Sequence, residues 1–133
     1  MQDYNSMSVP MTMNLTKLRD STSSSQNVDS TLYRQLIGSL MYLVHTRPDI
    51  CYTVNALSQF MSDLKHIHWV AAKHILRYVQ GTVTYGIRYT SSSGVLLSGY
   101  SDSDWVGSVV DRKSTSGYCF SMGSVMISWS SRK

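Results

Sequence analysis

Apolar residues recur at helical spacing through the first part of the chain and at strand-like spacing after it. Between residues 31 and 44 they lie three or four positions apart, which puts them on one face of a helix. Asp29 or Ser30 can cap the start of this helix. The face consists of Tyr33, Leu36, Ile37, Leu40, Met41 and Val44.

Two further helices are predicted. Pro48 suits the first position of the second, and Thr46 and Asp49 have the spacing of a capping box. The third helix is predicted from about His66 to Gln80. The apolar face of the second contains Ile50, Val54, Leu57, Phe60 and Met61, and that of the third contains Trp69, Ala72, Leu76 and Val79.

The pattern then changes to that of β-strands. Strands are predicted at residues 84–90, 95–102, 117–122 and 125–130, with turns at Ser91–Gly94 and Gly123–Ser124. Because all helices precede all strands, we predict an α+β fold with separate layers rather than an alternating parallel sheet. It has a three-helix N-terminal part and a partial, mainly antiparallel sheet of about four strands. We divide the chain into a flexible, Ser-rich lead-in at 1–30, a helical segment at 31–82 and a β segment at 83–133.

Composition adds only broad limits. Twelve basic and eight acidic residues give a net charge of +4, which allows nucleic-acid binding but is equally typical of a solvated surface. No secretory signal and no apolar run long enough to span a bilayer is visible, so we predict an intracellular location, cytoplasmic or nuclear, without membrane contact. Cys51 and Cys119 lie far apart and match no metal or disulfide framework, so we interpret both as buried, reduced thiols.

Acidic residues supply the first candidate chemistry. Asp102 and Asp104 lie near the end of a predicted strand, which we expect to be central in the sheet, and residues two apart in a strand face the same side. They could form part of a divalent-metal site, or they could close the strand in an ordinary Asp-rich turn. The eight acidic residues are all Asp, and Glu is absent.

Basic residues and histidines supply the rest. Lys73 and Arg77 share one face of the third helix and could track a nucleic-acid backbone, or simply form its solvated face. Arg112 and Lys113 lie in a charged loop that could contact phosphate, or be a solvated turn. His66 and His68 form an HxH pair on different helix faces without Cys or Glu partners, which argues against a zinc site.

Three blocks of the sequence, in the same order, resemble copia-type retrotransposon Pol polyproteins over nearly the whole chain. The first follows the reverse-transcriptase palm in that family, and the last opens its RNase H domain. The matching stretches are Tyr33–Leu43 with Thr46–Ile50, His68–Thr82, and Gly99–Gly107 with Asp111–Tyr118 and Ile127–Lys133.

This resemblance implies that residues 31–82 belong to the polymerase thumb and connection, and that 83–133 contain the first three strands of RNase H. The family's first metal-binding RNase H carboxylate corresponds to Asp102, whereas Asp104 is not expected to be catalytic. The polymerase Tyr-x-Asp-Asp turn, the RNase H Glu and the later Asp residues have no counterpart. The resemblance also implies that the intact parent uses Mg²⁺ as its cofactor and binds an RNA–DNA hybrid.

The expected function is that of an incomplete part of a Pol polyprotein, from the RNA-directed DNA polymerase and ribonuclease H region. A single carboxylate holds Mg²⁺ only weakly, so we expect neither stable metal binding nor catalysis by the isolated chain. The exposed sheet, including Leu96, Val125, Ile127 and Trp129, would favour self-association. The alternative is a domesticated, non-catalytic module that binds nucleic acid or protein. An effector-like role is disfavoured, because no secretory signal or RxLR motif is present.

Overall fold

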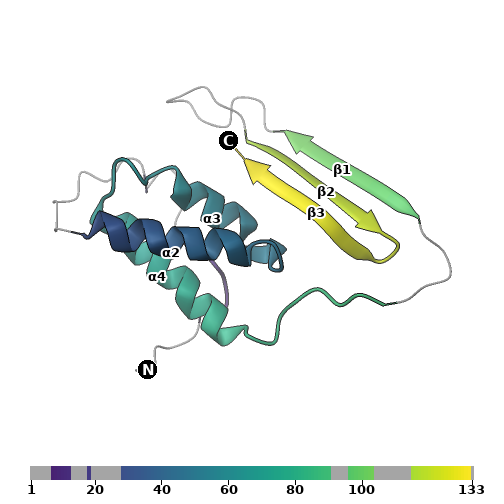
Figure 1. The fold of residues 1–133 in the computed structure, drawn as a ribbon, viewed down its shortest axis with the longest axis horizontal. Coiled ribbons are helices and arrows are strands. Elements are labelled where there is room, and N and C mark those ends of the chain that lie inside the picture. The colour runs from purple at the N-terminus through teal and green to yellow at the C-terminus, as the bar shows by residue number, and fades with distance from the viewer. Residues whose placement is uncertain (1–6, 13–17, 19–27, 91–95, 104–114, 133) are drawn as a thin grey trace. The chain divides into compact units, whose positions relative to one another are not determined.

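A computed structural model describes residues 7–12, 18, 28–90, 96–103 and 115–132. The chain forms two compact units, residues 1–85 and 86–133. The first unit is helical and the second contains an antiparallel sheet, so the predicted α+β fold class is confirmed (Figure 1).

The first described helix, α2 (Ser30–Leu43), begins where the sequence predicts. The Asp29 carboxylate accepts hydrogen bonds from the backbone N–H groups of Thr31 (2.8 Å) and Leu32 (3.3 Å). These N–H groups have no partner within the helix, so the carboxylate stabilises its first turn. Tyr33, Ile37 and Leu40 form its buried side, and part of the predicted apolar face remains more open, with Met41 exposed.

The second predicted helix is divided into a 3-10 turn, η1 (Pro48–Ile50), and α3 (Cys51–Ser58). Pro48 stands at the start as predicted. The capping box between Thr46 and Asp49 does not form, because the Thr46 hydroxyl donates instead to the Leu43 carbonyl at 3.2 Å. The Asp49 carboxylate pairs with Arg47, as described below.

The third helix, α4 (His66–Gly81), covers the predicted range, but its buried face differs from the predicted one. Ala72 is buried as expected, whereas Leu76 is 42% exposed and its neighbour Ile75 is fully buried. Both residues are apolar, so periodicity alone allows a face rotated by one position. The buried residues of α4 are His68, Ala71, Ala72, Ile75 and Tyr78.

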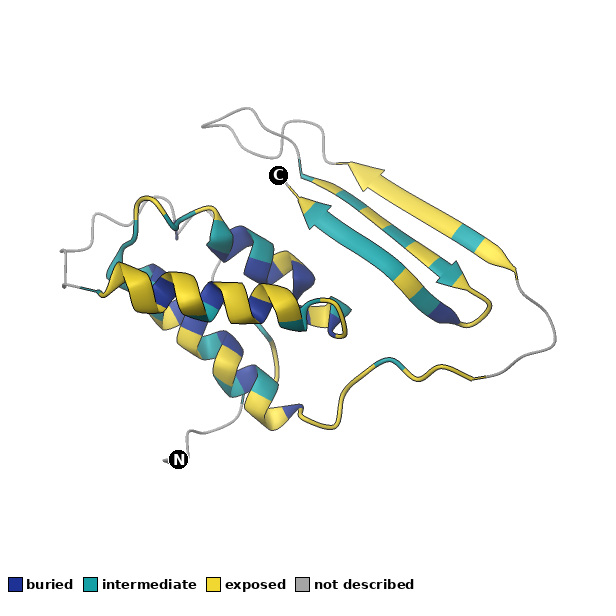
Figure 2. Cartoon of the chain, viewed as in Figure 1, coloured by how far each residue is buried: buried dark blue, intermediate teal, exposed yellow. Residues whose placement is uncertain are grey.

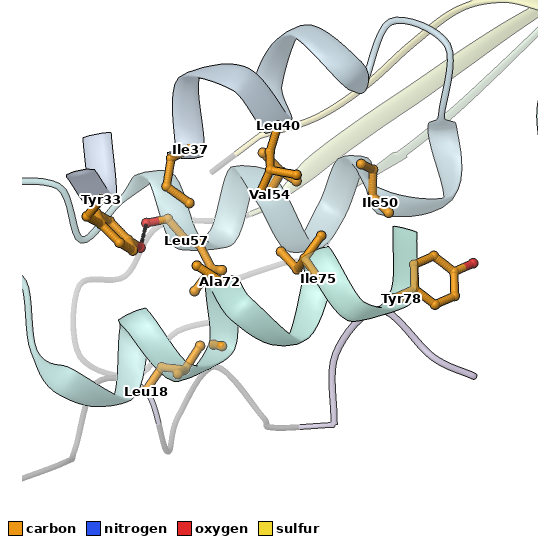
Figure 3. Close-up of a cluster of buried hydrophobic side chains, with 11 residues drawn as sticks. Leu18, Tyr33, Ile37, Leu40, Ile50, Val54, Leu57, Ala72, Ile75 and Tyr78 are labelled. Atoms are coloured by element: carbon orange, nitrogen blue, oxygen red, sulfur yellow. Dashed lines mark hydrogen bonds between the residues drawn. The ribbon is translucent and has the colours of Figure 1, made fainter. Parts of the chain in front are cut away.

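The core of the first unit lies between α2, α3 and α4 (Figure 3). The fully buried Tyr33 hydroxyl donates to the Leu57 carbonyl at 2.9 Å, and so joins α2 to the end of α3. Leu18 is also fully buried in this core, and Met7 and Met11 pack against it. These three residues belong to the predicted lead-in, and burial of their apolar side chains favours packing on the core.

The second unit contains the strands β1 (Leu97–Ser103), β2 (Ser116–Met122) and β3 (Val125–Arg132), in the spatial order β1-β2-β3. Both neighbouring pairs are antiparallel. The predicted Gly123–Ser124 turn joins β2 to β3, and Gly123 has a φ of 63°, a conformation that suits glycine. A β-bulge lies opposite Phe120 and Ser121.

Two predictions about the sheet are corrected. Residues 84–90 form no strand: Thr84 lies in a turn and residues 85–90 have no regular structure, so the described sheet has three strands instead of four. Alternating apolar residues do not make a strand without a neighbour to pair with. Strand β1, which carries Asp102, lies at an edge of the described sheet rather than at its centre. The Ser91–Gly94 turn lies outside the described residues.

Most side chains of the sheet are partly or fully exposed (Figure 2). Leu96 and Ile127 are exposed and Trp129 is half-buried, as expected, whereas Val125 is buried. On one face Leu97, Phe120 and Met122 are exposed. The register of the two strands places Phe120 of β2 opposite Gly99 of β1. A side chain at position 99 would collide with the Phe120 ring. Glycine there leaves space for the aromatic group.

The two cysteines lie in different units and neither forms a disulfide. Cys51 is buried in α3, as predicted, and Cys119 in β2 is half-buried rather than fully buried. None of the helices in the described ranges is long and apolar enough to cross a membrane.

Candidate functional site

The predicted RNase H carboxylate, Asp102, lies on β1 and is exposed. The register places it opposite Gly117 of β2, which in turn pairs with Ser131 of β3. This row contributes no second carboxylate. Across the described ranges, no three His, Cys, Asp or Glu side chains gather where they could hold a metal ion. The described residues thus do not form a two-metal site, which needs several carboxylates. Asp104 lies outside them.

The predicted basic face of α4 is present in part. Lys73 is exposed, and its Nζ lies 5.0 Å from the centre of the Trp69 ring, within cation–π distance. Arg77, one turn further along, is half-buried. Exposed Val70 and Leu76 lie on the same helix, so this surface is mixed rather than uniformly basic. Arg112 and Lys113 lie outside the described residues.

The HxH pair does not form a metal site. His68 is buried, and its Nδ1 accepts the Lys65 backbone N–H at 3.0 Å while its Nε2 donates to the Leu18 carbonyl at 2.9 Å. Its ring also stacks on Phe60, with 4.0 Å between ring centres. Both ring nitrogens are therefore occupied. Burial lowers the pKa of His68 and the nearby Lys65 charge lowers it further, although the bond to Leu18 opposes this.

A second histidine of α4 contacts the N-terminal segment. His74 Nε2 donates to the Val9 carbonyl at 2.9 Å. Together with His68, it attaches two points of the segment before α2 to one helix. The sequence alone did not indicate either contact, because the partners are 65 and 50 residues away.

Sequence reasoning also missed a polar cluster around Arg47, a residue that is only 4% exposed. Its guanidinium donates to both carboxylate oxygens of Asp49, from Nε at 2.9 Å and from Nη2 at 2.7 Å. It also donates to the Thr82 carbonyl at 3.0 Å and the Thr82 hydroxyl at 2.7 Å. Such paired, charge-assisted hydrogen bonds hold a planar guanidinium in one orientation.

Tyr78 completes this cluster. Its hydroxyl donates to Asp49 at 2.8 Å, and its ring centre lies 5.7 Å from the Arg47 guanidinium carbon. The pKa of Asp49 is lowered, mainly by the hydrogen bond from Arg47. The pKa of Tyr78 is raised, mainly by burial and next by its hydrogen bond to Asp49. The short Arg-Pro-Asp spacing was a usable signal for the ion pair. The contact with Thr82, 35 residues away, left no signal in the sequence.

Comparison with known proteins decides the family. Pol polyproteins of the Arabidopsis thaliana transposons RE2 and RE1 are each 48% identical to the chain, over 105 and 111 residues. The matches cover 79% and 84% of the chain but only 7% and 8% of those proteins. The chain belongs to the copia-type retrotransposon Pol family.

A shorter relative covers most of the same region as this Pol segment. "Secreted RxLR effector protein 161" of Plasmopara viticola is 49% identical over 102 residues, which are 76% of the chain and 72% of that protein. No family model and no solved structure matches the Pol segment. The resemblance drawn from three sequence blocks is thereby confirmed at the level of the family, and the name of the shorter relative describes that protein alone.

Proposed function

We propose that residues 31–82 correspond to the thumb and connection of a copia-type Pol polyprotein and that residues 83–133 contain the first strands of its RNase H domain. The observation that carries this proposal is the position of Asp102. It is exposed on the first strand of an antiparallel β1-β2-β3 sheet that follows a helical unit, within the block where the family has a metal-binding Asp.

In the intact parent, Asp102 would supply one Mg²⁺ ligand, and Lys73, Arg77, Arg112 and Lys113 would contact the RNA–DNA hybrid. The exposed Lys73 and the net charge of +4 support the second role. The isolated chain is inactive on this proposal. The absence of Glu from the sequence supports inactivity, as does the lack of a carboxylate cluster among the described residues. Catalytic residues that act as a unit lose nearly all of the rate when one of them is missing, so a partial carboxylate set is not expected to be partly active.

A cleavage assay tests the inactivity. An RNA–DNA hybrid labelled on the RNA strand is incubated with the purified chain and with Asp102→Asn, in Mg²⁺ and separately in Mn²⁺. Equal background in both proteins is expected. RNA-strand cleavage by the chain that is lost in Asp102→Asn would overturn the proposal.

A chimaera tests the role in the parent. Residues 96–132 of this chain replace the matching segment of the transposon RE1 Pol polyprotein, and the same RNA-strand cleavage is measured. The chimaera is expected to cleave, and the chimaera carrying Asp102→Asn is expected to have lost the activity. Retention of full activity by the Asp102→Asn chimaera would exclude Asp102 as a metal ligand.

The second candidate function is a non-catalytic module that binds nucleic acid or protein. The exposed Lys73 beside Trp69 favours nucleic acid. If this is correct, binding to an RNA–DNA hybrid weakens steeply with salt, and Lys73→Gln lowers both affinity and the salt slope. Arg88→Gln removes the same charge from an exposed position outside α4 and serves as the matched control. Equal effects of the two variants would show only a general charge effect.

Self-association through the sheet belongs to the same proposal. Leu97, Phe120 and Met122 are exposed on one face, and β1 and β3 form the edges of the described sheet. Sedimentation velocity should show concentration-dependent dimers that Phe120→Ser reduces. An exclusively monomeric chain at high concentration would contradict it.

A further inference from the structure

The first unit ends at the polar cluster that contains Arg47. Helix α4 ends at Gly81, Thr82 follows it, and Tyr85 is the last residue of the unit. Residues 86–90 then have no regular structure. The helical unit therefore extends past the end of α4, as far as Tyr85, before the chain continues into the β unit.

Thr82 uses both its backbone and its side chain in this region. Its backbone N–H donates to the Val79 carbonyl at 3.1 Å, and its hydroxyl donates to the Tyr78 carbonyl at 2.8 Å. Its carbonyl accepts from Arg47 at 3.0 Å and from the Tyr85 N–H at 2.9 Å. Thr82 is 6% exposed, whereas Val83 beside it is 75% exposed. One residue of an otherwise open turn is thus held inside the unit.

Arg47 provides the other half of this contact. Asp49 accepts hydrogen bonds from its guanidinium and is itself held by the Tyr78 hydroxyl, and the Tyr85 ring centre lies 5.8 Å from the guanidinium carbon. The last carbonyls of a helix lack intrahelical partners, and a cation near them is favourable. A buried Arg from the α2–η1 connection satisfies this need at the end of α4.

We infer that Arg47, Asp49, Tyr78 and Thr82 form an exit clamp, which fixes the position and direction in which the chain leaves the helical unit. The freedom of the connection to the β unit then begins at Gly86 and not at the end of α4. The clamp is a positioning device for the following segment, and this inference does not depend on the proposed function.

The test measures where backbone freedom begins in the full chain. Amide hydrogen exchange and the ¹⁵N heteronuclear NOE are recorded for residues 70–90 by NMR. Thr82→Val keeps the shape of the side chain but removes the hydroxyl, and should raise exchange at Thr82 and Tyr85 about fivefold or more, the effect of losing a buried hydrogen bond. The NOE of residues 82–85 should fall to that of residues 86–90, while Ala72 stays protected.

Two variants make the result specific. Thr82→Ser retains the hydroxyl and should keep the wild-type profile. Thr84→Val makes the same chemical change at an exposed position in the same turn and should also leave the profile unchanged. Unchanged exchange and NOE in folded Thr82→Val, or an equal loss in Thr84→Val, would overturn the inference.

If Thr82→Val fails to fold, Arg47→Lys takes its place. Lysine keeps the positive charge but cannot bridge Asp49 and both Thr82 oxygens as a planar guanidinium does. Raised exchange at Thr82 and Tyr85 in Arg47→Lys supports the clamp, and a wild-type profile contradicts it.

Discussion

The buried histidine of α4 gives the sharpest prediction about stability. His68 accepts the Lys65 N–H through Nδ1 and donates to the Leu18 carbonyl through Nε2, while its ring stacks on Phe60. His68→Asn can still accept the Lys65 N–H, because its oxygen lies near the position of Nδ1, but it is too short to reach Leu18. His68→Gln reaches toward Leu18 but no longer caps the start of α4.

The magnitude follows from what each variant removes. An unsatisfied buried carbonyl costs about 1–3 kcal/mol, and a stacked aromatic pair contributes about 0.5–1.5 kcal/mol. His68→Asn should therefore lower the free energy of unfolding by about 2–4 kcal/mol. His68→Gln loses a helix cap, about 1 kcal/mol, together with the stacked pair, so about 2 kcal/mol is expected. Urea denaturation followed by circular dichroism at the helical signal measures both.

The same residue predicts a pH dependence. Burial lowers the folded-state pKa of His68 below its ordinary value of 6.5, and Lys65 opposes and Asp63 favours its protonation. Between the two pKa values the unfolded chain binds more protons than the folded one. Stability from His68 is thus complete above pH 6.5 and falls as the pH drops toward the folded-state pKa.

Urea denaturation at pH 7.5, 6.5 and 5.5 tests this dependence. The wild type should lose stability toward pH 5.5, and both His68 variants should lose less of theirs. His66→Asn, on the same helix, should retain the wild-type slope and serves as the matched control. A wild-type pH slope in His68→Asn, or a loss of stability below about 0.5 kcal/mol, would contradict these roles of His68.

Three further predictions concern single contacts. Tyr33→Phe leaves the Leu57 carbonyl without its side-chain partner and should lower stability in urea by about 1 kcal/mol. Gly123→Ala forces a side chain into a backbone with φ of 63° and should weaken protection of the β2–β3 amides by about 1 kcal/mol. Asp49→Asn should destabilise the chain near neutral pH. Because Arg47 lowers the Asp49 pKa, this difference from wild type should shrink as the pH falls below about 4.

Local signals in the sequence predicted most of the helical unit. Asp29 was recognisable as a cap because its carboxylate acts on residues two and three positions later. The Gly123–Ser124 turn was recognisable because it joins two adjacent strands of alternating character. Such features depend only on residues that are close in sequence, so they can be predicted from the sequence alone.

Features that depend on distant partners could not be predicted. The choice between Ile75 and Leu76 as the buried residue of α4 depends on how α4 packs against α2 and α3. Residues 84–90 alternate like a strand but pair with none of the strands that the structure describes. Of the candidate site, Asp102 and Lys73 were named from the sequence and are exposed, and their roles stay predictions. The contact between Arg47 and Thr82 joins residues that no local pattern connects.

The division of the two cysteines between the units has a practical consequence. Cys51 is shielded within α3 and Cys119 is partly open in β2. A thiol-alkylating reagent such as N-ethylmaleimide should therefore modify Cys119 long before Cys51. In mass spectrometry of the wild-type protein, the first mass increment would then mark Cys119, and the second would time the opening of the helical unit around Cys51.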